Sequence, residues 1–251
     1  MISITASPLS GPFFREGNST AVLFIHGFSA TPSELYPVAL QLHATKGYTV
    51  KGPLLPGHGS LPEELNHTVW TDWYETVEEE MHNLRAQYDK VVLAGLSMGA
   101  LLALHAGCRL EGINAVAAIN APIYNRQPWL TLLAPVIQYI KPYFPKKMDE
   151  TRARLEEEGR FAYNVTPVQA FRSMMKLRGI VMRELDRLTA PLLVIQSLQD
   201  QSVRTESADY IMKHATRCRA CLLKLPRSGH IATMGPEKDI IVQSIIKLAD
   251  G

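Results

Sequence analysis

The sequence contains little cysteine and almost no excess charge of either sign. Its 251 residues include three cysteines, Cys108, Cys218 and Cys221. So small and odd a number argues against a secreted disulfide scaffold and favours a reducing compartment. The 26 lysines and arginines nearly balance the 24 aspartates and glutamates, which gives a formal net charge of +2. This balance excludes a basic field for nucleic acid and a polybasic anchor for an anionic membrane.

Targeting segments and cofactor motifs are also missing. Residues 1–14 have neither a basic start nor a continuous apolar run, so we expect no signal peptide and a cytoplasmic protein. Residues 91–108 are uncharged, but the glycines and serine at their centre favour a buried strand, turn and helix over a membrane span. Cys218 and Cys221 lie at the start of a predicted strand, without a second Cys or His pair at zinc spacing. We therefore predict neither a metal nor a cofactor.

Short apolar runs alternate with amphipathic segments along most of the chain, whose length suits one large core. Runs that are apolar on both faces are typical of parallel strands covered by helices. Strands are predicted at residues 21–25, 48–50, 91–94, 113–119, 192–195 and 220–225, and helices at residues 32–43, 70–87, 100–108, 206–214 and 237–248. This alternation predicts an α/β fold with a mostly parallel sheet.

The alternation stops after Pro122. Residues 123–171 show no clear strand, and they contain four prolines before position 150, several aromatic residues and a charged helix expected at residues 150–159. We predict a core of residues 1–122 and 172–251 with an inserted cap of residues 123–171. Ile123, Tyr124 and Trp129 are candidates for an apolar acyl pocket, because ligand pockets are mostly apolar. The alternative is that the cap's apolar residues form its own core.

A candidate nucleophile lies in the pattern Gly-x-Ser-x-Gly at residues 95–99. A predicted strand precedes Ser97 and a predicted helix follows it. A serine on so tight a turn presents its hydroxyl to solvent, and glycines two residues to either side avoid backbone clashes. The alternative is a glycine-rich turn with an incidental serine, but the strand and helix around it favour a nucleophile.

A serine hydroxyl needs a base to take its proton, and that base needs a carboxylate to orient it. Of the eight histidines, five lie in or beside predicted helices. His26 and His58 lie in glycine turns, whereas His230 lies on the loop after the last predicted strand. Sites in open parallel sheets form at the carboxyl ends of strands, so His230 is the predicted base. Asp200, on the loop after residues 192–195, is the predicted acid.

Negative charge that develops on a substrate oxygen needs backbone N–H donors. We predict two donors, the amides of Met98, directly after the candidate nucleophile, and of Phe28, on the loop after the first strong strand. The alternative for residues 26–28 is a simple glycine turn.

Together these motifs resemble those of the α/β-hydrolase fold, and within it those of bacterial carboxylesterases and monoacylglycerol lipases of the Bacillus type. The order Ser97, Asp200, His230 is typical of that fold. The resemblance covers nearly all of the chain outside the cap and rests on residues 26–28, 31–32, 47–48, 53–59, 70–73, 95–99, 120–122 and 228–230. One departure is Gln199, because related enzymes often have histidine or aspartate before the acid.

The resemblance implies hydrolysis of short- to medium-chain carboxylic esters or monoacylglycerols, through an acyl-enzyme on Ser97 and without a cofactor. The expected partner is therefore a small-molecule ester. A thioesterase, amidase or peptidase with the same three residues is the alternative, because this fold hosts many reactions. A non-catalytic binding protein would usually lack one of the three residues, and all three are present here. The sequence leaves the oligomeric state open.

Overall fold

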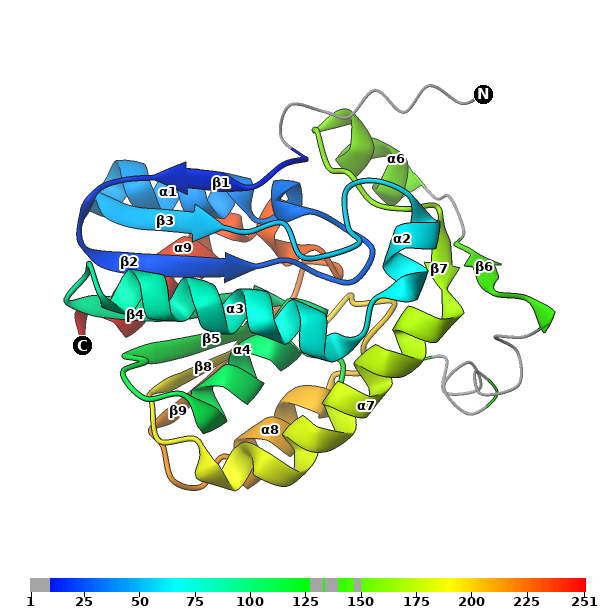
Figure 1. Cartoon of the computed structure of the whole chain (residues 1–251). Helices are drawn as coiled ribbons and strands as arrows, with labels where there is room; N and C mark the ends of the chain where they lie inside the picture. Colours follow the sequence, from blue (N-terminus) through cyan, green and yellow to red (C-terminus); the bar gives the residue numbers. More distant parts are fainter. Residues whose placement is uncertain (1–9, 127–132, 134–139, 147–149) are drawn as a thin grey trace.

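The computed structural model describes residues 10–126, 133, 140–146 and 150–251, and Figure 1 shows a twisted sheet with helices packed on both faces. The strands are β1 (Phe13–Arg15), β2 (Asn18–Ile25), β3 (Tyr48–Gly52), β4 (Lys90–Leu96), β5 (Ala115–Ile119), β6 (Tyr143–Pro145), β7 (Val165–Pro167), β8 (Leu192–Ser197) and β9 (Ala220–Leu225). The α-helices are α1 (Tyr36–Lys46), α2 (Pro62–His67), α3 (Trp70–Arg85), α4 (Met98–Arg109), α6 (Glu150–Glu157), α7 (Val168–Glu184), α8 (Glu206–His214) and α9 (Lys238–Asp250). Short 3-10 turns are η1 (Pro32–Glu34), η2 (Leu185–Arg187) and η3 (Ala232–Met234).

Seven strands form the main sheet in the order β1-β3-β2-β4-β5-β8-β9. All neighbours run parallel except β1, which pairs antiparallel with β3 at one edge. In β2, Val22 and Phe24 join one apolar core while Leu23 and Ile25 join the other, because successive side chains of a strand point to opposite faces. The predicted α/β fold with a mostly parallel sheet is confirmed. Among the seven strands of this sheet, β1 was not predicted, because its three residues are too few to show an apolar pattern.

Helices cover both faces of the sheet. One apolar core includes residues of α3, α4, α7 and α8, and the other includes residues of α1 and α9. Trp73, Val77, Met81 and Leu84 of α3 are all buried, as their helical spacing predicts. Among the described residues, no helix is both long enough and apolar enough to cross a bilayer.

The segment between β5 and α7 differs from the prediction. We predicted no strand within residues 123–171, but β6 and β7 pair there as a two-stranded antiparallel sheet. Each has three residues, too few for an alternating pattern to be recognised. The charged helix predicted at residues 150–159 is present as α6. The predicted boundary at residue 171 falls inside α7, and the division into core and cap stays a prediction.

Candidate active site

Ser97 lies at the sharp turn between β4 and α4. Its φ of 56° and ψ of −116° place its backbone in a region that residues with a side chain rarely adopt. A Cβ atom on Gly95 would lie 2.1 Å from the carbonyl oxygen of Gly99, and one on Gly99 would lie 1.9 Å from that of Ile25. Both glycines are therefore required by close backbone contacts, and these contacts hold Ser97 at the carboxyl end of β4.

The structure brings Ser97, His230 and Asp200 together. His230 Nε2 lies 3.0 Å from Ser97 Oγ, and His230 Nδ1 lies 2.7 Å from Asp200 Oδ2. The Asp200 side chain is fully buried, whereas 21% of the His230 side chain is exposed. A partly accessible imidazole thus connects a hydroxyl to a buried carboxylate, which is the arrangement needed to take a proton from that hydroxyl.

The neighbours of Asp200 keep its carboxylate charged. Burial by itself would raise the pKa of this group. The adjacent His230 and the N–H groups of Ser202 and Val203, which donate to Oδ1 at 2.7 and 2.9 Å, outweigh burial and lower the pKa below its usual range. An ionised Asp200 accepts a hydrogen bond from Nδ1–H of His230, so the lone pair on Nε2 faces Ser97.

The predicted oxyanion donors are the amides of Phe28 and Met98. Within the described part of the chain, neither N–H donates a hydrogen bond to another group. Met98 is the first residue of α4, where a helix has no internal acceptor for its N–H. The loop that contains Phe28 lies beside the nucleophile, because a Cβ atom on the preceding Gly27 would be 3.5 Å from Ser97 Cβ. The Met98 amide and the loop that carries the Phe28 amide therefore both lie next to Ser97, and the role of the two amides as oxyanion donors stays a prediction.

A buried ion pair supports the loop that contains Phe28. Glu34 Oε1 accepts a hydrogen bond from Gly27 N–H at 2.6 Å, and Glu34 Oε2 lies 3.2 Å from a guanidinium nitrogen of Arg160. Glu34 is fully buried and Arg160 is 11% exposed. Arg160 lies between α6 and β7, so the segment between β5 and α7 contributes directly to the shape of this loop.

Two residues that support the His230 loop were given no role in the sequence analysis. Asn120, after β5, has a φ of 49°, and its side chain donates to the His230 carbonyl and accepts from Ser197 N–H, both at 2.8 Å. Buried Glu237 accepts a hydrogen bond from Ser228 Oγ at 2.7 Å. For Asn120 the available signal was its position after a strand, whereas Glu237 resembles any acidic residue before a helix.

His26 and His58 are buried beside the loop that contains Phe28. Leu55 N–H donates to His26 Nε2 at 3.1 Å, so the proton is on Nδ1, which donates to the Gly27 carbonyl at 3.0 Å. The rings of the two histidines meet edge to face at 4.8 Å. Burial lowers the pKa of both, and they connect two loops as neutral side chains, unlike the partly exposed His230.

The substrate-pocket candidates have different surroundings. Ile123 is buried in the apolar core, while Tyr124 is 36% exposed and its ring packs against α8. Trp129 lies outside the described residues. Phe171 of α7, which the sequence did not single out, contacts the ring of Phe28 with a centroid distance of 6.3 Å. The role of Ile123, Tyr124 and Trp129 in a substrate pocket stays a prediction.

Metal ligands do not gather in the part of the chain that the structure describes. No group of three or more His, Cys, Asp or Glu side chains there has the arrangement of a metal site. Cys108, Cys218 and Cys221 are free thiols.

Comparison with known proteins shows which family the chain belongs to. Residues 22–240 match the model of the alpha/beta hydrolase family. The chain is 28% identical over 240 residues to a carboxylesterase of Bacillus subtilis (strain 168), covering 95% of this chain and 96% of that protein. It is 29% identical over 245 residues to a thermostable monoacylglycerol lipase of Bacillus sp. (strain H-257), covering 94% and 93%. A solved structure from work on LipS and LipT, two metagenome-derived lipolytic enzymes, has a TM-score of 0.87 at 27% identity, covering 98% of this chain and 100% of that chain. The chain therefore belongs to the alpha/beta hydrolase family.

Proposed function

We propose that this chain hydrolyses carboxylic esters of short- to medium-chain acyl groups, including monoacylglycerols, through an acyl-enzyme on Ser97. The observation that carries the proposal is the line of hydrogen bonds from Ser97 Oγ through His230 to Asp200. The names of the two Bacillus relatives, a carboxylesterase and a monoacylglycerol lipase, support an ester as the substrate.

The proposed reaction has two halves. His230 Nε2 takes the proton of Ser97 as Oγ attacks the ester carbonyl carbon, and the imidazolium then gives that proton to the leaving alcohol. Asp200 keeps the imidazole in the required tautomer and stabilises its charged form. The amides of Phe28 and Met98 donate to the tetrahedral oxyanion, each contributing about 3 kcal/mol. In the second half, water activated by His230 releases the acid and restores Ser97.

The experiment is hydrolysis of 4-nitrophenyl esters over a series of acyl lengths, with 1-monoacylglycerols assayed in parallel. We expect turnover by the native chain and a loss of about a thousandfold or more in kcat for Ser97→Ala. Ser244→Ala on α9 is the matched control. Helix α9 packs on the face of the sheet opposite to α4, and the hydroxyl of Ser244 donates only to the Ile240 carbonyl.

Labelling separates the remaining possibilities. A serine-reactive phosphonate should add one adduct, which peptide mass spectrometry should locate on Ser97. If the adduct forms on Ser97 but no ester is hydrolysed, we would infer a thioester or amide as the substrate in place of an ester. Full ester turnover by Ser97→Ala would refute the proposed nucleophile.

A further inference from the structure

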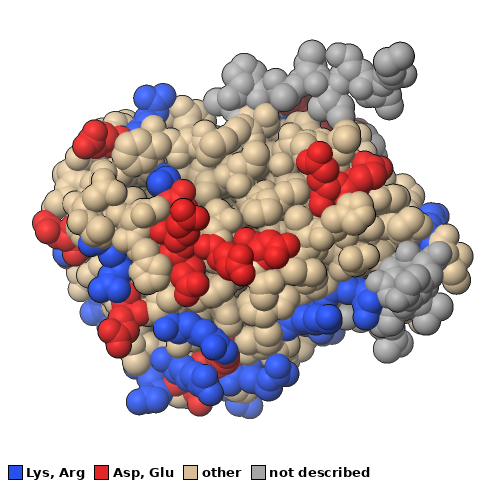
Figure 2. Space-filling view, viewed as in Figure 1, with Lys and Arg blue, Asp and Glu red and all other residues tan. Residues whose placement is uncertain are grey.

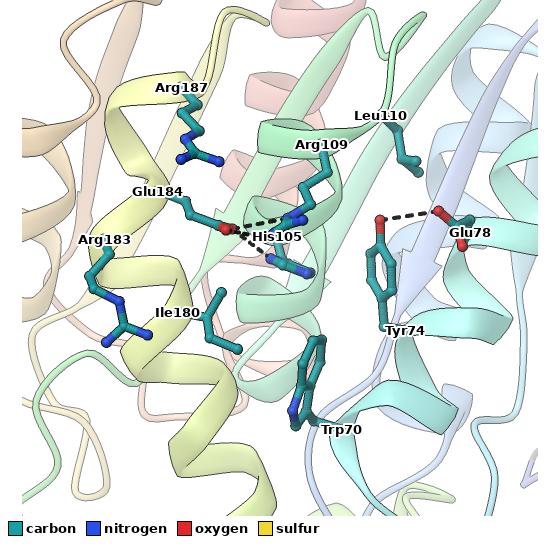
Figure 3. A pocket seen from close by; sticks show the side chains of 10 residues that line it. All are labelled: Trp70, Tyr74, Glu78, His105, Arg109, Leu110, Ile180, Arg183, Glu184 and Arg187. Carbon is teal, nitrogen blue, oxygen red and sulfur yellow. Dashed lines mark hydrogen bonds and ion pairs between the residues drawn. The ribbon is translucent and has the colours of Figure 1, made fainter.

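A pocket lies away from Ser97, between α3, α4 and α7. Its volume is about 650 Å³, and Figure 3 shows side chains from all three helices pointing into it. Its lining residues are Trp70, Tyr74, Glu78, His105, Arg109, Leu110, Ile180, Arg183, Glu184 and Arg187. None of them belongs to the proposed catalytic machinery.

Aromatic rings form the floor of this pocket. The His105 ring meets Trp70 edge to face at 5.3 Å and Tyr74 at 4.7 Å. Leu110 and Ile180, both half-buried, add aliphatic surface. Such a floor favours a flat or apolar ligand body, since most small-molecule sites are apolar with a few polar anchors.

His105 provides a polar atom at the floor. The residue is 2% exposed, and its Nδ1 lies 2.9 Å from a carboxylate oxygen of Glu184. Burial lowers its pKa, so the neutral ring donates through Nδ1–H and presents a lone pair on Nε2. In the described part of the chain Nε2 has no hydrogen-bond partner, and Figure 3 shows it on the side of the ring away from Glu184.

The rim of the pocket is positively charged on one side. The carboxylate of Glu184 is already paired with Arg109, so it does not neutralise the two neighbouring arginines. Arg183 and Arg187 are exposed and have no hydrogen-bond or ion-pair partner among the described residues. Glu78 lies on the opposite wall, where it accepts a hydrogen bond from Tyr74.

The molecular surface around the pocket is likewise basic on the α7 side and acidic on the α3 side. Figure 2 shows Lys and Arg gathered along the lower part of this face, where Figure 1 places α8 and the end of α7. Acidic side chains gather above them, near α3. A negatively charged ligand therefore meets a favourable field on the α7 side of the pocket.

We propose that this pocket is a second ligand site, which binds a small organic carboxylate with a flat apolar body. The carboxylate lies at Arg183 and Arg187, whose planar guanidinium groups suit bidentate hydrogen bonds to it. The apolar body lies on Trp70 and Ile180. Its C–H edge, which carries a partial positive charge, faces the Nε2 lone pair of His105. This site is independent of the reaction at Ser97.

The test is isothermal titration calorimetry of the full chain with 2-naphthoate and with naphthalen-2-ylmethanamine, which has the same ring system and a positive charge. We expect binding of the carboxylate, weakened by added NaCl, and binding of the amine at least about tenfold weaker. The double variant Arg183→Gln/Arg187→Gln should weaken naphthoate binding about tenfold or more.

The matched control is Lys238→Gln/Lys247→Gln, which removes the same net charge from α9 on the other side of the sheet. It should leave naphthoate affinity within about twofold of the native value. Because all four side chains are exposed, we expect every variant to fold, which circular dichroism checks. Equal affinity for carboxylate and amine, no detectable naphthoate binding, or equal effects of the two double variants would overturn the proposal.

Discussion

At the turn that contains Ser97, close backbone contacts leave no room for a side chain at Gly99. Gly99→Ala would place a methyl group 1.9 Å from the Ile25 carbonyl oxygen, so β2 and α4 must separate. We expect the free energy of unfolding, measured in urea, to fall by about 3 kcal/mol. Gly179→Ala in α7 is the control, because its methyl would meet only Arg183 Nη1 at 3.8 Å. It should stabilise by about 0.5 kcal/mol, and equal effects would contradict the close contact.

Asn120 is expected to act by positioning His230. Asn120→Ala removes the hydrogen bond to the His230 carbonyl, which allows the imidazole to move away from Ser97. We predict that kcat for 4-nitrophenyl ester hydrolysis falls about tenfold or more, with a smaller change in KM. Asn83→Ala, an exposed position on α3, is the control. An unchanged kcat in the Asn120 variant would show that the loop keeps its position without this bond.

The sequence allowed some of these residues to be found and not others. Ser97, Asp200 and His230 each follow an apolar run, and the carboxyl ends of parallel strands meet at one edge of a sheet. Glu34 could not be found in this way, because its importance comes from burial beside Gly27 and from Arg160, far away in the sequence. Such contacts depend on how the loops pack, which local patterns do not encode.

At the level of elements, the segment between β5 and α7 is bound to the loop after β2 by the Glu34–Arg160 ion pair. Arg160→Met would leave the buried Glu34 carboxylate without the guanidinium that pairs with it, and we expect a loss of about 3 kcal/mol in unfolding free energy. The double variant Glu34→Gln/Arg160→Met should lose less than the sum of the single variants, because the neutral amide introduced at position 34 needs no cation. Urea unfolding of the four proteins measures this coupling. Additive losses would mean that the ion pair contributes nothing.

Element boundaries followed the apolar pattern closely in the sheet and poorly elsewhere. The strand predicted at residues 220–225 is β9 to the residue, because Arg219 and Pro226 bound this short segment. The hairpin of β6 and β7 and the helices α2 and α7 were missed. Their positions depend on packing between the segment after β5 and the rest of the chain, so tertiary contacts outweigh local preference.

For the whole molecule, buried histidines predict a pH dependence of stability. Burial lowers the pKa of His26, His58 and His105 from their usual 6.5. The unfolded chain therefore binds more protons just below pH 6.5, so the free energy of unfolding should decrease as the pH falls from about 7.5 to about 5.5. Urea titrations at several pH values measure this slope.

A buried and an exposed histidine can be compared directly. His58→Gln should flatten the slope, whatever its effect on stability at neutral pH, because one proton-linked group is gone. His82→Gln, at an exposed position on α3, should leave the slope unchanged. If the native protein shows no loss of stability over this range, the buried rings must accept protons without cost, which would contradict their surroundings.

The bond between Arg160 and Glu34 also affects how this chain can be recombined with its relatives. A crossover between positions 34 and 160 separates a buried acid from the base that neutralises it, unless both parents have the same pair. The two positions should therefore be inherited together. In a library of chimaeras selected for folding, we expect parental combinations at 34 and 160 to be enriched over mixed ones.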